Sequence, residues 1–207
     1  MSADVLAKLL AKRAAAYGSN GELERARLDL RVALAQEGLP TALRTEIATL
    51  LANVDGELKL KLLKNNAFKF SQQKDWVKCA SNLTKAIQLV SNANQAQDQQ
   101  IDVLALGSLM ADRAAASLAQ GLCARCVEDC ERTLAMLDLV TPEQLSQANI
   151  IRKVCLIRRG TARAWVGHLA DARGDFKTAI DLEQDEQEQE RLRNDLNMLG
   201  QVSRQVS

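Results

Sequence analysis

Three closely spaced cysteines, Cys123, Cys126 and Cys130, are the residues of this chain best suited to chemistry. The spacing Cys-x-x-Cys can bind zinc through two thiolates, and a third thiol follows four residues later. A structural zinc site has four ligands, however, and no fourth cysteine or histidine lies near these three in the sequence. Spacings of three and four also place the side chains on one stripe of a helix, where free cysteine packs as a small apolar residue. We expect core packing, with no metal and no cofactor; a zinc enzyme is the alternative that metal analysis would test.

Catalysis has little other support in the sequence. The single histidine, His168, follows Gly167 in an expected turn, and no serine, cysteine or paired-carboxylate motif accompanies it. The glycines occur singly or in expected turns, without the glycine-rich loop that cradles phosphate. We therefore predict that the chain is not an enzyme.

The elements that must position these residues are expected to be helices. Of 207 residues, 47% are hydrophobic but only 3% are aromatic, and two are proline. Alanine, leucine and long polar side chains favour helices, whereas β-branched and aromatic residues favour strands, so we predict an all-α fold.

Charge and hydropathy exclude several classes of partner. The chain carries 27 Lys and Arg against 26 Asp and Glu, a net charge of +1. This balance lacks the basic field with which nucleic-acid-binding proteins collect phosphates. No apolar run reaches the roughly 18–20 residues that span a bilayer. Five cysteines behind an N-terminus without signal-peptide features indicate reduced thiols. We expect no nucleic acid, no membrane and a cytoplasmic location.

Four segments of the chain repeat one pattern, at residues 12–34, 64–87, 112–134 and 158–180. Each has a first helix with a small residue, a turn, and a second helix with small or apolar residues at spacings of three and four. The pattern resembles the tetratricopeptide repeat, a 34-residue pair of antiparallel helices. In the first copy the matching positions are Ala14, Tyr17, Ala26, Leu30 and Ala33, and the first position recurs as Ala67, Ala114 and Gly160.

The resemblance implies a right-handed superhelix of stacked antiparallel helical hairpins, an α-solenoid with a concave face. The repeats are longer than the family's, because Ala33 and Ala86 lie 53 residues apart, and the 12 to 19 extra residues per repeat must form longer helices or connectors. We expect an N-terminal hairpin with a following helix at 1–56, as part of a longer array. We expect it to be followed by three repeats at 57–182 and a polar capping helix at 183–207.

In this family the concave face binds protein partners, so the resemblance implies a scaffold for protein or peptide binding. The candidate groove residues are Lys8, Lys12, Lys61, Lys64, Asn65, Phe68, Asp112, Arg158, Thr161 and Trp165. Cations beside apolar patches suit an extended, partly acidic peptide. The alternative is that these lysines only keep amphipathic helices soluble. Trp165 is either a binding anchor or a core residue, and we assign Trp76 to packing.

Some members of the family bind the acidic C-terminal tails of heat-shock chaperones through a clamp of basic and amide side chains. Lys64 and Arg158 match the clamp positions, whereas Phe68 and Asp112 do not. A carboxylate at Asp112 would repel a carboxylate ligand, which argues against a working clamp.

Residues 59–182 also resemble the repeats of axonemal dynein assembly factors, through Asn65-Asn66-Ala-Phe, Asp112-Arg113-Ala-Ala and Arg158-Arg159-Gly160. This resemblance implies a cytosolic or ciliary-base scaffold between chaperones, dynein assembly factors and client dynein chains. The competing interpretation is a structural module that self-associates through its N-terminal end.

Overall fold

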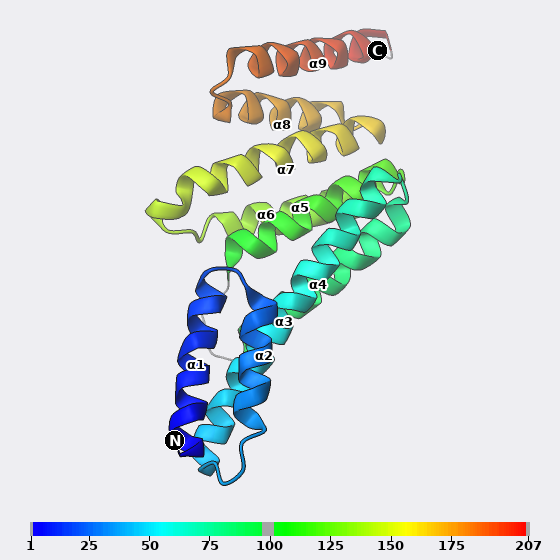
Figure 1. Ribbon diagram of the computed structural model, residues 1–207. Helices are drawn as coiled ribbons and strands as arrows, with labels where there is room; N and C mark the ends of the chain where they lie inside the picture. Colours follow the sequence, from blue (N-terminus) through cyan, green and yellow to red (C-terminus); the bar gives the residue numbers. More distant parts are fainter. Residues whose placement is uncertain (1, 97–101, 206–207) are drawn as a thin grey trace. The chain divides into compact units, whose positions relative to one another are not determined.

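The computed structural model describes residues 2–96 and 102–205, with 93–96 and 199–205 described by their backbone alone. Every regular element within these ranges is helical (Figure 1), which confirms the all-α class. The elements are α1 (Ala3–Ser19), α2 (Leu23–Leu34), α3 (Thr41–Gln72), α4 (Trp76–Ala96), α5 (Val103–Ala119), α6 (Cys123–Leu137), the 3-10 helix η1 (Pro142–Gln144), α7 (Leu145–Trp165), α8 (Leu169–Leu182) and α9 (Glu186–Gln205). None of these helices combines the length and apolar character that a membrane span requires.

The chain forms two compact units, Met1–Leu63 and Lys64–Ser207, and the boundary between them falls inside the 32-residue helix α3. In the first unit, α1 and α2 form a hairpin, and residues from the start of α3 complete its core. Ala14, Ala26 and Leu30 of the hairpin share this core with Ile47 of α3. Small residues let the two helices of the hairpin pack closely. A single hairpin cannot bury its outer apolar face alone, and here the start of α3 covers that face.

The second unit stacks hairpins in chain order. The end of α3 turns into α4, α5 pairs with α6, and α7 pairs with α8, while α5 and α6 both contact α7 (Figure 1). Helix α9 then packs on α8. Leu192 of α9 joins Leu156 and Phe176 in one core cluster, so α9 covers the last hairpin with one apolar stripe. The domain boundaries that the sequence suggested at residues 56 and 182 stay a prediction, and residues 206–207 lie outside the described part of the chain.

The extra residues between repeats are mostly helical. Helix α3 begins at Thr41, well before the second repeat, and α7 begins at Leu145, well before the fourth. Thr141 and Gln144 form a reciprocal capping box around η1, directly before α7. The polar stretch at 91–100 is helical as far as Ala96, and its remainder lies outside the described residues.

Candidate functional site

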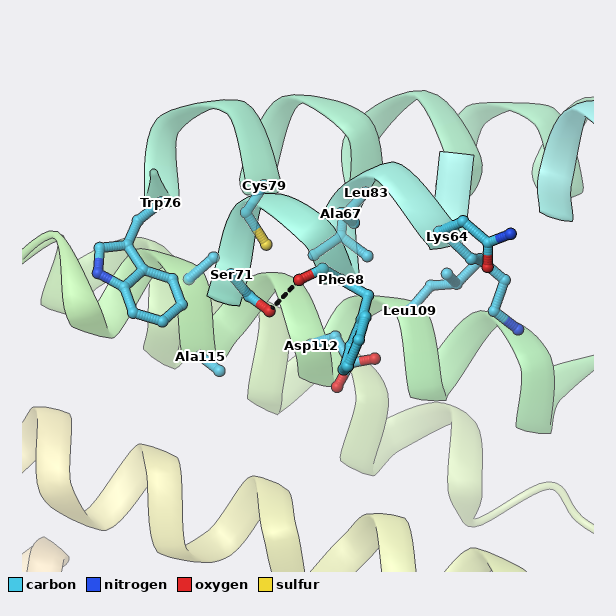
Figure 2. Close-up of a pocket in the computed structure, with 12 residues that line it drawn as sticks. Lys64, Ala67, Phe68, Ser71, Trp76, Cys79, Leu83, Leu109, Asp112 and Ala115 are labelled. Carbon is cyan, nitrogen blue, oxygen red and sulfur yellow. Dashed lines mark hydrogen bonds between the residues drawn. The ribbon is translucent and has the colours of Figure 1, made fainter. Parts of the chain in front are cut away.

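A hollow of about 520 Å³ opens in the second unit among α3, α4 and α5 (Figure 2). Its lining residues are Lys64, Asn65, Ala67, Phe68 and Ser71 from α3, Trp76, Cys79 and Leu83 from α4, and Leu109, Asp112, Ala115 and Ala116 from α5. The size lies within the usual range for a binding pocket, and most of the lining is apolar.

Local sequence explains why the space stays open. Ala67, Ala115 and Ala116 are too small to fill it, and the aromatic rings stand at its edge instead. Phe68 is 67% exposed, although its side chain is large and apolar. Figure 2 shows its ring reaching from α3 toward Asp112, with Trp76 at the end opposite Lys64. The hollow therefore has an apolar floor, aromatic walls and charges near one end.

The turn before α4 fixes Trp76 at the hollow. Helix α3 ends where Lys74 adopts a positive φ of 58°, and the Asp75 N–H then donates to the Phe70 carbonyl oxygen at 2.9 Å. The Asp75 carboxylate accepts from the N–H of Lys78 at 3.1 Å, which starts the new helix. Trp76 is thereby held at the first position of α4, half-buried against the hollow.

The charges at the mouth of the hollow are partly paired with each other. Asp112 Oδ1 lies 3.8 Å from Nη1 of Arg158, and that nitrogen donates a hydrogen bond to the Ala111 carbonyl oxygen. Loss of hydration beside the surrounding helices raises the pKa of Asp112 above its ordinary value, while the positive charges of Arg158 and Lys64 act against this rise. The Asp112 side chain is still 59% exposed and lies beside the Arg158 guanidinium.

The structure brings together four of the candidate residues, Lys64, Asn65, Phe68 and Asp112. The others on the second unit lie outside the lining of the hollow. Arg158 is bound to Ala111, and the Thr161 hydroxyl donates to the Ile157 carbonyl oxygen of its own helix at 2.9 Å.

Trp165 ends α7 and is 62% exposed, so it is not a core residue.

The remaining candidates, Lys8, Lys12 and Lys61, belong to the first unit and are exposed. Lys8 pairs with Asp4 at 3.0 Å on the surface of α1. This contact fits the alternative in which the lysines keep amphipathic helices soluble. Ligand binding by any of these residues stays a prediction.

Sequence reasoning missed the part played by α4. Trp76 was assigned to packing, but it lines the hollow and is only half-buried. The corresponding positions of the other hairpins hold Leu23, Cys123 and Leu169, all of them smaller. The size of Trp76 at a position that holds smaller residues in the other hairpins was the available signal that its side chain does not pack like theirs.

The cysteines pack as expected. Cys126 and Cys130 are fully buried in a cluster that also contains Cys155 of α7 and Ala114 of α5, while Cys123 is half-buried at its edge. Hydrogen bonds with Cys126 and Cys155, together with burial, raise the pKa of the Cys130 thiol. No group of three cysteine, histidine or acidic side chains among the described residues is arranged to hold a metal ion. His168 is exposed in the turn between α7 and α8, as predicted.

The fold and the hollow define a class, a stack of helical hairpins with an open, largely apolar hollow. No family model matches the chain, and a search of curated proteins finds no match. Among solved structures, the chain is similar to the first TPR of Spaghetti (RPAP3) bound to an HSP90 peptide. The two are 20% identical, the match covers 70% of this chain and 93% of that chain, and the TM-score is 0.49.

It is also similar to the TPR2AB domain of yeast Sti1 in complex with pHSP90. Here the identity is 18%, the match covers 96% of this chain and 69% of that chain, and the TM-score is 0.46. At these identities the likeness concerns the helical fold alone. The comparisons do not show the narrower resemblance to axonemal dynein assembly factor 4, which depends on the sequence motifs.

Proposed function

We propose that the chain is a non-enzymatic protein-interaction module that holds a peptide segment of a partner protein in the hollow. The observation that carries the proposal is Phe68, a large apolar side chain left 67% exposed at the edge of an apolar-floored hollow. Covering such surface stabilises a complex by roughly 25 cal/mol per Å² of apolar area. Exposed apolar patches rimmed by polar groups are typical of interaction sites.

The proposal is tested by comparing the partners that two matched variants retain from a cell extract. Phe68→Glu places a charge at the edge of the hollow, whereas Val77→Glu places one outside its lining, at a residue of nearly the same exposure, 68% against 67%. We expect Phe68→Glu to lose a set of partners that both wild type and Val77→Glu keep. The purified partners must then bind purified wild-type protein directly. A partner set that Phe68→Glu leaves unchanged would contradict the proposal.

A narrower form of the proposal concerns acidic C-terminal peptides of heat-shock chaperones. Lys64 supports it as an exposed cation at the hollow. Two observations argue against it: Asp112 carries a carboxylate there, and Arg158 already pairs with Asp112 and donates to the Ala111 carbonyl oxygen. Titration with such peptides at rising salt tests this form, with Lys64→Glu as the charge-reversal variant. Arg158→Glu is unsuitable, because Arg158 is 25% exposed and donates to the backbone of α5.

The pathway is also part of the narrower proposal. The motif resemblance of residues 59–182 favours chaperone-linked assembly of axonemal dynein, in the cytoplasm or at the base of a cilium. A tagged chain in ciliated cells should then capture dynein assembly factors or dynein chains, and Phe68→Glu should lose them. Ciliated cells that lack the chain but assemble dynein arms normally would contradict this pathway.

A second candidate function is self-assembly through the first unit. Four large apolar side chains on α1 and α2, Val5, Leu9, Leu28 and Val32, are 45% to 58% exposed. Light scattering over a dilution series should then show mass rising with concentration, and replacement of Leu9 and Leu28 by glutamine should abolish the rise. A monomer at every concentration would remove this candidate.

A further inference from the structure

The charge arrangement at the hollow limits what kind of peptide can enter. A ligand carboxylate beside Lys64 would also face Asp112, whose oxygen lies 3.8 Å from Arg158. Arg158 already donates to Ala111 and pairs with Asp112, so a new anion must compete for it. Like charges in contact disfavour binding, and the penalty grows as ligand and site lose water.

The apolar part of the hollow has the opposite character. Leu83 and Leu109 lie at its floor, each buried to less than 5% exposure, while Phe68 and half-buried Trp76 form open walls. Aromatic walls over an aliphatic floor suit one large apolar side chain, because the ring faces supply contact area at low entropic cost. The exposed amide of Asn65 can both donate to and accept from a passing peptide backbone.

We propose that the hollow binds an internal, extended peptide segment through one large apolar side chain placed between Phe68 and Trp76, without using a C-terminal carboxylate. This inference rests on the proposed peptide-binding function and specifies its ligand. Charge complementarity carries it, since a chain-end carboxylate beside Lys64 would also meet the Asp112 carboxylate, while Arg158 is already engaged by Asp112 and by the Ala111 carbonyl oxygen.

The chain holds two tryptophans, which give the experiment an internal control. Trp76 lines the hollow, whereas Trp165 lies at the end of α7 outside it. The probes are synthetic peptides of Gly, Ser and Asn with one central Leu or Ala, and an acidic peptide ending in Asp. Each is prepared with a free and an amidated C-terminus and titrated while the two indole N–H signals are followed by NMR.

We expect the Leu peptide to shift the Trp76 signal and to leave Trp165 in place. The Ala peptide should bind about tenfold more weakly, because less apolar area is buried. Amidation should change neither affinity by more than about twofold, since charge at the chain end is not used. Phe68→Ala should lower the affinity for the Leu peptide about tenfold, whereas Val77→Ala should leave it unchanged. Both variants are first checked for wild-type helicity.

The remaining outcomes contradict the inference in distinguishable ways. If a free C-terminal carboxylate is needed for binding, the ligand is a chain end, and the proposed peptide-binding function survives. If no peptide shifts Trp76, the hollow is not a peptide site of this kind. The partner comparison between Phe68→Glu and Val77→Glu then decides separately whether the proposed function also fails.

Discussion

Arg113 on α5 holds Asp129 on α6 through two parallel hydrogen bonds, from Nε at 2.9 Å and from Nη2 at 2.6 Å. The same two-point pair joins Arg13 to Asp29 and Arg159 to Asp175, and the partners are sixteen positions apart in the sequence each time. Each pair fastens the first helix of a hairpin to the second. In the hairpin of α3 and α4 the equivalent residues are Asn66 and Asn82, and Asn82 donates to Lys78 of its own helix.

Removing Asp129 should destabilise the second unit strongly. Asp129→Ala leaves the Arg113 side chain, which is only 21% exposed, without its carboxylate, and we expect a loss of about 3 kcal/mol in the free energy of unfolding. Asp29→Ala should cost the first unit less, because the Arg13 side chain is 58% exposed and water can replace the lost partner. Urea denaturation measures both losses. Equal losses would show that the exposure of the arginine does not determine how much each pair contributes to the free energy of unfolding.

The turn at Lys74 should improve when glycine replaces lysine. The hairpin turns of the other repeats place Gly21, Gly121 and Gly167 at positive φ, whereas the turn between α3 and α4 places Lys74 there at 58°. A side chain in this conformation costs about 1 kcal/mol, so Lys74→Gly should raise stability by that amount. The reciprocal control is Gly121→Lys, for which thermal unfolding should show a comparable loss. A neutral Lys74→Gly would contradict the argument.

Sequence reasoning reached the hairpins because small residues recur at one position of every repeat. Ala14, Ala67, Ala114 and Gly160 are all nearly or fully buried where paired helices approach. Spacing alone also placed the cysteines correctly, since a stripe at intervals of three and four must face one side of a helix. The arginine–aspartate pairs were missed, although the sixteen-residue spacing is visible in three copies.

The hollow was predictable only in part. The repeat register shows which face of a helix a residue occupies, and it groups Lys64, Phe68 and Asp112, which line one hollow in the structure. The register does not show which side chains are already bound. Arg158 occupies the same repeat position as Asp112, but its guanidinium already donates a hydrogen bond to the Ala111 carbonyl oxygen of the neighbouring hairpin. Such contacts depend on how closely neighbouring hairpins pack, which the repeat register does not give.

Stability should fall in acid through the pair that Lys153 forms with Glu183. The hydrogen bond from Lys153, with backbone N–H donors at Asp185 and Gln184, lowers the pKa of Glu183 from 4.5 to about 2. The unfolded chain therefore takes up this proton at a higher pH than the folded chain. The contribution is complete above the unfolded pKa and is lost as the pH falls toward about 2.

Glu183→Gln isolates this effect from other carboxylates. Urea denaturation over a pH series should show wild type more stable than the variant at neutral pH, with the gap closing as the pH drops below about 4.5. A gap that stays constant with pH would mean that the Glu183 charge does not contribute.

The buried thiols should be unreactive in the folded protein. Cys126, Cys130 and Cys155 are fully buried, and the raised pKa of Cys130 keeps it protonated at neutral pH. Because the thiolate is the reactive form, Ellman's reagent should label half-buried Cys123 first and these three only after unfolding. Cys123→Ser should abolish the fast phase. Labelling of Cys130 in protein that keeps native helicity would contradict the packing.

Two glycines should respond to alanine in opposite directions. A Cβ at Gly160 of α7 would lie 3.1 Å from two ring atoms of Phe176 on α8, so Gly160→Ala forces the helices apart and should cost about 2 kcal/mol. A Cβ at Gly56, inside α3, would meet nothing within 4 Å. Gly56→Ala should therefore gain about 1 kcal/mol from helix propensity alone. Thermal unfolding of both variants measures the difference. A gain at both sites would mean that the close approach of α7 and α8 at Gly160 does not exist.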